Sequence, residues 1–316
     1  MANQYSIHAE SVIKHFGTTK ALDGVSLKAD YGKVTGLLGP NGSGKTTLIK
    51  IMSSLLEPTQ GKVLIDGIDV HRHPNQVRNI IGLAGQYAAV DDYLTGRETL
   101  EMVGRLYHMP KKEIKKRSNE LLQQLGLEDA ADRQTKTYSG GMRRRLDLGA
   151  SLVSTPKVLF LDEPTTGLDP RTRLQLWSII QDLVTKGVSI LLTTQYLEEA
   201  DALADKMYVL NHGKVIAKGT SGSLKSSLGV DIIEVIVKQN QLILAQKSLT
   251  QKLNKTITID ELTRRLQIKT KNGSDDILLV AQILHDIKIK PEELSLHRPS
   301  LDDVFMSLTA ERNHNA

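Results

Sequence analysis

Short apolar runs alternate with longer segments of helical periodicity along the first two-thirds of the chain. The runs KVTGLLG, KVLIDG, KVLFLDE and VSILLTT have the length and aliphatic content of buried strands. Helix-patterned segments separate several of them. In one, residues 110–127, the apolar residues Ile114, Leu121 and Leu125 recur at helical spacing. Strands that alternate with helices indicate a layered α/β domain.

The pattern changes after GTSGSLKSSLG, residues 219–229, a segment whose glycine and serine content is typical of a linker or domain boundary. Beyond it, VDIIEVIVK and RLQIKT are predicted strands and DDILLVAQILHDI is a predicted helix. We therefore expect a first domain over residues 1–225 and a small accessory or regulatory α/β domain over residues 226–316. SLDDVFMSLTAER predicts a short final helix with an apolar face formed by Leu301, Val304, Phe305 and Leu308.

Composition narrows the class of protein. The chain has 316 residues, of which 40% are hydrophobic and 24% charged, as expected for about two globular domains. It has no cysteine, which excludes disulfides and thiolate metal sites. The N-terminus has no apolar stretch of signal-peptide length, and no apolar run approaches the roughly 20 residues of a membrane-spanning helix. We expect a cytoplasmic protein that reaches a membrane only through a partner.

The net charge of +5 raises the question of an anionic partner. The densest basic stretch is the predicted helix at residues 110–127, where a solvated helix face is the simpler interpretation. Aromatic residues make up only 4% of the chain, too few for the stacking platforms that bind single-stranded nucleic acid. We therefore expect no nucleic-acid partner.

The segment LLGPNGSGKTTLIK carries the strongest chemical signal. It matches G-x-x-x-x-G-K-[ST] at residues 39–46, between a predicted strand and a predicted helix. Glycines let successive backbone N–H groups curve around a polyphosphate, and the helix N-terminus adds partial positive charge. Lys45 would reach the β- and γ-phosphates and the Thr46 hydroxyl would bind Mg²⁺. The predicted nucleotide-binding residues, called the cradle below, are Gly39, Pro40, Asn41, Gly42, Ser43, Gly44, Lys45, Thr46 and Thr47.

Two adjacent carboxylates end the run KVLFLDEPTTGLDP. The apolar residues before them predict a buried strand, so Asp162 and Glu163 would emerge at its carboxyl end, where α/β sheets bind ligands. Asp162 suits the Mg²⁺ shell, through a water molecule, and Glu163 is placed to polarise a water for attack on the γ-phosphate. Such a pair alone is more often a solvated strand end, but together with the cradle it favours catalysis.

A third element is TYSGGMRRRLDLGASL. Ser139, Gly140 and Gly141 precede a predicted helix whose free N–H groups and hydroxyl could bind an anion. Taken alone, this tripeptide is equally compatible with a simple helix cap.

In this order the three elements resemble the nucleotide-binding subunits of ABC transporters, over about the first 225 residues. The resemblance implies a P-loop NTPase layered α/β domain with a helical subdomain at about residues 88–155, and it implies ATP and Mg²⁺ as ligands. It adds three residues. Phe16 would stack on adenine, although a lone phenylalanine is by default a core residue. Gln86 would contact Mg²⁺ and the attacking water, and Asp169 would lie in a loop that communicates across a dimer.

Three positions depart from the family pattern. Tyr138 and Met142 replace the usual Leu and Gln around the Ser-Gly-Gly tripeptide, and Gln195 stands where a histidine is usual. These departures, with GQYAAVDDYLTGRETL and RPSLDDVFMSLT, resemble the daunorubicin-resistance branch, which drives drug export. A glutamine amide can hold the γ-phosphate and a water by hydrogen bonds, but it does not titrate. Gln195 is thus expected to act with Glu163 and Gln86; the alternative is that it only caps the next helix.

The resemblance also implies how such a subunit works. Two copies close head-to-tail, so that ATP lies between the cradle of one and Ser139 of the other. Hydrolysis then drives a separate membrane permease that exports a drug or another amphipathic compound, with residues 87–100 passing the motion on. One alternative is a soluble ABC-type ATPase acting on ribosomes or nucleic acid, which usually carries two cassettes, a coiled-coil insert or zinc-binding cysteines. Another is a module that binds ATP without cleaving it, against which Lys45, Asp162 and Glu163 argue.

Overall fold

The computed structural model describes residues 4–86, 90–227, 231–297 and 300–305. The chain divides into two compact units, Met1–Ser221 and Gly222–Ala316, each with its own hydrophobic core. The segment at residues 219–229, predicted to be a linker, contains helix α8 (Ser221–Ser227). The predicted domain boundary after Lys225 falls inside this helix.

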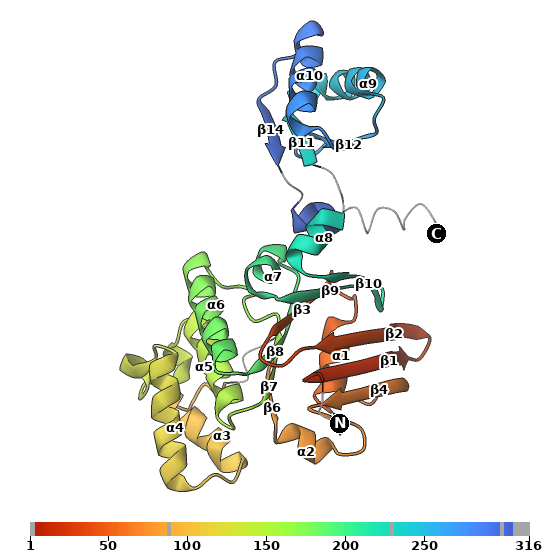
Figure 1. Cartoon of the computed structure of the whole chain (residues 1–316). Coiled ribbons are helices and arrows are strands. Elements are labelled where there is room, and N and C mark those ends of the chain that lie inside the picture. Colours follow the sequence, from red (N-terminus) through yellow and green to blue (C-terminus); the bar gives the residue numbers. More distant parts are fainter. Residues whose placement is uncertain (1–3, 87–89, 228–230, 298–299, 306–316) are drawn as a thin grey trace. The chain divides into compact units, whose positions relative to one another are not determined.

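A six-stranded sheet forms the centre of the first unit, in the order β10-β9-β3-β8-β7-β6 (Figure 1). Strands β3, β6, β7, β8 and β9 are parallel, and β10 is antiparallel to β9. Parallel strands are covered on both faces, which is why three of them read as continuous apolar runs in the sequence. The strands are β3 (Val34–Leu38), β6 (Ile81–Ala84), β7 (Val158–Asp162), β8 (Ser189–Thr194), β9 (Lys206–Asn211) and β10 (Lys214–Gly219).

A second, antiparallel sheet has the order β2-β1-β4-β5. Its strands are β1 (Ile7–Phe16), β2 (Thr19–Ala29), β4 (Gln60–Ile65) and β5 (Ile68–Asp69). Helix α1 (Lys45–Met52) contacts β2 and β4 of this sheet and β7 of the parallel sheet, and one core cluster joins these four elements. The run KVLIDG is confirmed as a strand, β4, but it belongs to the antiparallel sheet. The short helix α2 (Pro74–Arg78) follows β5.

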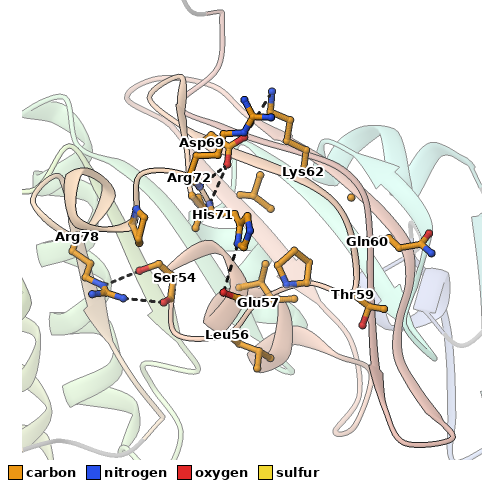
Figure 2. A pocket seen from close by; sticks show the side chains of 16 residues that line it. Ser54, Leu56, Glu57, Thr59, Gln60, Lys62, Asp69, His71, Arg72 and Arg78 are labelled. Atoms are coloured by element: carbon orange, nitrogen blue, oxygen red, sulfur yellow. Dashed lines mark hydrogen bonds and ion pairs between the residues drawn. The ribbon is translucent and has the colours of Figure 1, made fainter.

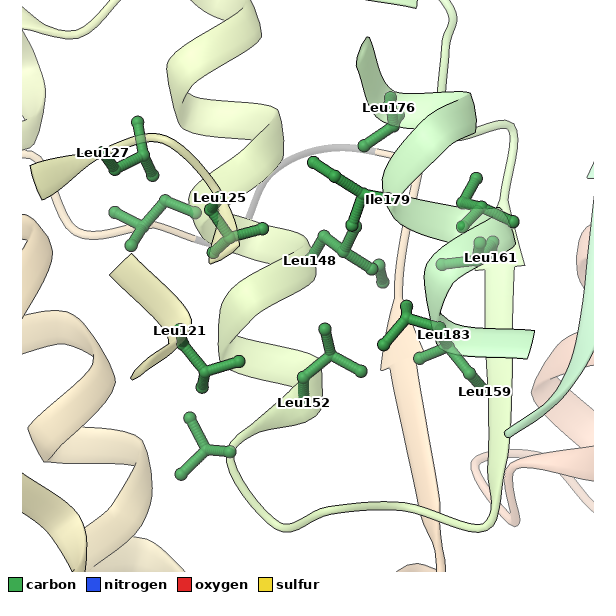
Figure 3. Packing of buried hydrophobic residues seen from close by; sticks show 14 of the residues in the cluster. Leu121, Leu125, Leu127, Leu148, Leu152, Leu159, Leu161, Leu176, Ile179 and Leu183 are labelled. Carbon is green, nitrogen blue, oxygen red and sulfur yellow. The ribbon is translucent and has the colours of Figure 1, made fainter. Parts of the chain in front are cut away.

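Residues 96–152 contain helices that gather on the side of the parallel sheet away from β1 and β2 in Figure 1. Thr95 and Glu98 form a capping box at the start of α3. Leu148 and Leu152 of α5 lie between Leu121 of α4 and the aliphatic side chains of β7 (Figure 3). The helices are α3 (Gly96–Leu106), α4 (Lys111–Gln124) and α5 (Gly140–Leu152), with 3-10 turns at Glu128–Ala130 and Thr135–Thr137; α6 (Pro170–Thr185) and α7 (Leu197–Leu203) follow.

The second unit has the element order β-α-β-β-α-β and the antiparallel strand order β12-β13-β11-β14, which is a ferredoxin-like arrangement. The predicted strands in VDIIEVIVK and RLQIKT and the helix in DDILLVAQILHDI are confirmed. Of the predicted final helix, residues 301–305 are helical, and Leu308 lies outside the described residues. The elements are β11 (Asp231–Ile236), a 3-10 turn (Gln239–Gln241), α9 (Leu242–Leu253), β12 (Ile257–Asp260), β13 (Arg265–Thr270), α10 (Gly273–Asp286) and β14 (Glu293–His297).

Candidate nucleotide-binding site

The cradle connects the carboxyl end of β3 to α1, and its backbone requires glycine at two places. At Gly44 the φ angle is 108°, a value that side-chain-bearing residues rarely adopt, and a Cβ there would lie 2.6 Å from the Ala21 carbonyl oxygen. At Gly39 a Cβ would lie 2.2 Å from the Leu210 carbonyl oxygen. Helix α1 begins directly after Gly44 without a side-chain cap, which leaves its first N–H groups available to an anion.

Lys45 lies almost wholly inside the protein, with 4% of its surface exposed. Its Nζ donates hydrogen bonds to the carbonyl oxygens of Gly39 at 2.8 Å and Pro40 at 3.2 Å. The same atom is 3.2 Å from Oε1 of Glu163, which is 6% exposed. The cation of the cradle and the predicted catalytic base therefore form a buried ion pair.

A cavity of about 320 Å³ brings four segments together. Gln86, which follows β6, and Glu163, which follows β7, line it together with Ala21 and most of the cradle, Asn41 to Thr47. In the part of the chain that the structure describes, the buried Ser43 hydroxyl has no hydrogen-bond partner. A buried hydroxyl without a partner is costly, and a phosphate oxygen in this cavity would satisfy it.

Asp162, at the end of β7, and Glu163, which follows it, share Thr193 of β8 as a hydrogen-bond partner. The Thr193 hydroxyl donates to Asp162 Oδ1 at 2.6 Å and accepts from the Glu163 backbone N–H at 3.1 Å. Glu163 has a φ of 50°, a left-handed value that is uncommon for residues other than glycine. Thr193 was missed from the sequence; its only signal was the polar end of the apolar run VSILLTT.

Gln195 lies at the bend between β8 and α7, and it is exposed. The N-cap of α7 is Tyr196, and Thr194 Oγ1 accepts the Tyr196 N–H at 2.9 Å, so the helix does not begin on Gln195 as the capping alternative required. Four residues further on, Glu199 is buried and accepts from Trp177 Nε1 at 3.2 Å. Burial raises the pKa of this carboxyl.

Ser139 is the N-cap of α5, and its Oγ accepts the Met142 N–H at 3.2 Å. Tyr138 before it is buried, which raises the pKa of its hydroxyl, and that hydroxyl donates to the Ala130 carbonyl at 2.6 Å. A Cβ on Gly96 would lie 2.3 Å from the Tyr138 hydroxyl. The tyrosine that departs from the family pattern is therefore accommodated by a glycine on α3 and by a carbonyl that accepts a hydrogen bond from its hydroxyl.

The residues that line the nucleotide cavity do not include Ser139, Gly140, Gly141, Asp169 or Phe16. Asp169 caps α6: its Oδ1 accepts the Thr172 N–H at 3.0 Å and its Oδ2 accepts the Thr172 hydroxyl at 2.6 Å. These bonds to Thr172 hold the pKa of Asp169 below its ordinary value. The expectation that a lone phenylalanine belongs to the core is wrong, because Phe16 is 50% exposed, with Lys14 Nζ 5.2 Å from its ring centroid.

A larger cavity of about 500 Å³ lies between the end of α1, β4, β5 and α2 (Figure 2). Several of its polar side chains bond to one another: Lys62 Nζ is 3.9 Å from Asp69 Oδ2, and Arg78 Nε donates to Ser54 Oγ at 2.9 Å. None of the predicted site residues lines this cavity. Cavity size alone therefore does not identify the functional site, because the predicted residues Lys45, Gln86 and Glu163 line the smaller cavity.

Comparison with known proteins gives the family. A family model described as "ABC transporter" matches residues 22–166 of this chain. The daunorubicin resistance ATP-binding protein DrrA2 of Streptomyces coeruleorubidus is 47% identical over 312 residues, which are 98% of this chain and 97% of that protein. This chain belongs to the ATP-binding subunits of ABC transporters. The daunorubicin/doxorubicin resistance ATP-binding protein DrrA of Streptomyces peucetius is 45% identical, over 96% of this chain and 92% of that protein.

Among solved structures, the dimeric ATP-binding cassette MJ0796, in a post-hydrolysis state bound to ADP and Pi, matches with a TM-score of 0.62 at 27% identity. The match covers 68% of this chain and 98% of that structure. The predicted resemblance and the predicted P-loop NTPase fold are confirmed, and as a member of this family of ABC ATPases the chain is an ATPase that binds ATP.

Proposed function

We propose that this subunit hydrolyses ATP with Mg²⁺ between two head-to-tail copies and so powers a separate membrane permease that exports a drug or another amphipathic compound. The observation that carries the proposal is the buried pair of Lys45 and Glu163 inside the cradle, with Gln86 on the same cavity. A γ-phosphate in the cavity would compete for the Lys45 ammonium and leave the Glu163 carboxylate to accept a proton from water.

The residues present fit a magnesium ion that is shared with phosphates. Thr46 and Gln86 supply oxygen atoms on the cavity wall, and Asp162 lies at the end of β7 beside Glu163. Among the described residues no group of three or more histidines, cysteines and acids could hold a metal by itself. Mg²⁺ at ATPase sites is held by one or two carboxylates, waters and the substrate phosphates, and it neutralises charge on the phosphate oxygens.

Closure with a second copy is supported by the position of Ser139. It is exposed at the N-terminus of α5 and lines no part of its own chain's nucleotide cavity. A helix N-terminus of this kind attracts phosphate, so the partner's ATP is the ligand we assign to it. Phe16 and Asp169, which lie outside the cavity, keep their proposed roles in adenine stacking and in communication between the copies.

A separate permease is supported by two observations. Among the described residues no helix is long and apolar enough to cross a membrane. The relatives that match over nearly the whole chain are named for resistance to daunorubicin and doxorubicin, which favours drug export at the cytoplasmic face of the cell membrane over action on ribosomes or nucleic acid. Residues 87–100 are the proposed contact with the permease; residues 87–89 lie outside the described structure, and α3 begins at Gly96.

Replacement of Glu163 by Gln tests the proposed chemistry. Glutamine keeps an oxygen near Lys45 but cannot take a proton, so we expect kcat to fall about a thousand-fold, on the scale of a lost general base, while ATP affinity stays unchanged. ATP should then hold two copies together, which size-exclusion chromatography detects. Lys45→Ala is the control, and it should lose ATP affinity instead because the polyphosphate loses its buried cation. Parental turnover in Glu163→Gln would remove Glu163 from its role.

Co-purification tests the partner. We expect the tagged chain, extracted from membranes in mild detergent, to carry a multi-span membrane protein with it. Sedimentation with ribosomes, and no membrane partner, would support the alternative of a soluble ATPase.

A further inference from the structure

Arg144 is a buried arginine on α5 whose hydrogen-bond partners all lie outside the cradle. It lies five residues after Ser139 and is 7% exposed. Its guanidinium donates to three backbone carbonyls: Nε to Pro164 at 2.7 Å, Nη2 to Asp162 at 3.1 Å, and Nη1 to Gly85. These carbonyls belong to two segments that are far from α5 in sequence.

The three carbonyls flank the residues that we assign to water activation. Asp162 and Pro164 are the neighbours of Glu163 on either side, and Gly85 directly precedes Gln86. One planar group therefore fixes the backbone before and after the base, and also the backbone that leads into the second water-binding residue. A guanidinium can do this because its five N–H donors form a rigid fork, whereas a lysine ammonium offers donors from a single point.

Burying a guanidinium opposes folding, and an apolar side chain could fill the same space without that loss of free energy. Burial lowers the pKa of Arg144, which reflects the cost of removing a guanidinium from water. Asp147, one turn further along α5, offsets part of this cost, with Oδ2 at 3.5 Å from Nη1. Buried ion pairs are often no more stabilising than well-packed apolar side chains, so stability alone does not explain this one.

We propose that Arg144 is a positioning residue for hydrolysis: it joins the helix that begins at Ser139 to the backbone that orients Glu163 and Gln86. This rests on the proposed function, because the helix matters to chemistry only if the partner's ATP binds at Ser139. Capture of phosphate at the start of α5 is then mechanically linked to the orientation of the base and of the water-binding amide.

The next residue on the same helix provides a matched control. Arg145 is also partly buried and also donates to backbone carbonyls, those of Leu125 at 2.7 Å and Gly126 at 3.3 Å. These carbonyls lie at the end of α4, away from both carboxylates. Arg145→Lys therefore makes the same chemical change with the same kind of structural loss, but it leaves Glu163 and Gln86 untouched.

The experiment compares Arg144→Lys with Arg145→Lys in the full-length protein. For Arg144→Lys we expect kcat to fall about 10- to 100-fold, the scale on which small misplacements of a reacting group act, while KM and the affinity for a fluorescent ATP analogue stay within about two-fold. Amide hydrogen exchange should rise at residues 162–166. For Arg145→Lys we expect a kcat within about two-fold of the parent and no change in exchange at those residues.

Parental kcat in Arg144→Lys would overturn the proposal, and so would a loss of kcat matched by Arg145→Lys or by an equal loss of ATP affinity. If Arg144→Lys does not fold, Asp147→Asn decides, since it keeps Arg144 and removes the charge that orients it. We then expect a smaller fall in kcat at constant KM, and an unchanged kcat would overturn the proposal. Failure of the proposed function looks different: the parent itself would show no turnover that Glu163→Gln removes.

Discussion

The two units of this chain are both α/β domains, but they differ in how many charged side chains they bury. Among the described residues the first unit buries six charged side chains: Lys45 and Glu163, which line the nucleotide cavity, Asp162 beside Glu163, and Arg144, Asp147 and Glu199 on helices α5 and α7. The second unit buries one, Glu234, whose Oε1 is 3.1 Å from Arg265 Nε. Burying a charge opposes folding unless it is paired. Most of this cost therefore falls on the first unit, where Lys45, Asp162 and Glu163, three of its six buried charges, are residues of the proposed ATPase site.

Both units also contain left-handed residues other than glycine. Glu163, inside the site, has a φ of 50°, whereas in the second unit the left-handed Asn254 forms the C-cap of α9, where such a conformation is common. A left-handed residue other than glycine costs on the order of 1–2 kcal/mol. In the first unit one such residue is the proposed catalytic base, and in the second unit one ends a helix.

The comparison predicts that the largest effects come from the start of α5. Ser139→Arg should reduce hydrolysis to background, because a large cation replaces the hydroxyl and helix N-terminus that would receive the partner's phosphate. ATP binding to the cradle should persist, since Ser139 does not line that cavity. Turnover by phosphate release and binding by a fluorescent nucleotide separate the two effects.

A mixture of two variants tests the head-to-tail arrangement more directly. A Ser139→Arg subunit and a Lys45→Ala subunit place both lesions in one interface, so a mixed pair retains one intact site. Labelled subunits should therefore associate in the presence of ATP, while Lys45→Ala alone should not. A mixture that shows no ATP-dependent association would contradict the head-to-tail arrangement.

The second prediction concerns Gln195, the exposed residue after β8. Gln195→Ala should lower kcat by a factor of roughly ten to a thousand, the scale of one lost donor to transition-state charge. Gln195→His should keep substantial activity and gain a pH dependence between about pH 6 and 7, because imidazole titrates there. Steady-state rates across this range measure both. Full activity in Gln195→Ala would leave Glu163 and Gln86 as the whole water-handling apparatus.

The sequence was most informative where the chemistry is local. The cradle and the Asp162–Glu163 pair each occupy one continuous segment, because a strand, a tight loop and a helix start can be specified by neighbouring residues. Contacts between distant segments were not predictable in this way. Thr193 beneath the carboxylates and Gly96 under Tyr138 depend on which strands and helices become neighbours, and neither residue forms a motif. The same holds for the ferredoxin-like strand order of the second unit, where β12 and β14 are too short and polar to stand out.

The third prediction concerns stability. Burial raises the pKa of Glu199, so the folded chain binds this proton more tightly than the unfolded chain. The contribution of Glu199 to stability is then fully present below the ordinary pKa of a glutamate and is lost as the pH rises towards the raised value. Glu199→Gln does not titrate, and its carbonyl can still accept from Trp177. We expect it to unfold at a temperature about 2–4 °C above the parent near pH 8, with a smaller difference near pH 5. A difference independent of pH would contradict this account.

The smallest effect tests the division of labour between the two units. Every buried charge near the cavity, and every residue of the cradle, lies before residue 222, and the first unit has its own two core clusters. A chain that ends after residue 229 should therefore bind ATP with an affinity within about two-fold of the parent, since it keeps all the groups that contact the polyphosphate. All the residues that line the cavity belong to the first unit, and the second unit has a hydrophobic core of its own. Equilibrium titration with a fluorescent nucleotide measures the affinity, and circular dichroism verifies the fold of the shortened chain. We expect removal of the second unit to weaken ATP-dependent association of two copies or coupling to the permease. Sedimentation measures the first and co-purification the second. Loss of ATP binding in a well-folded shortened chain would show that the first unit does not bind ATP by itself and that the second unit is needed for binding.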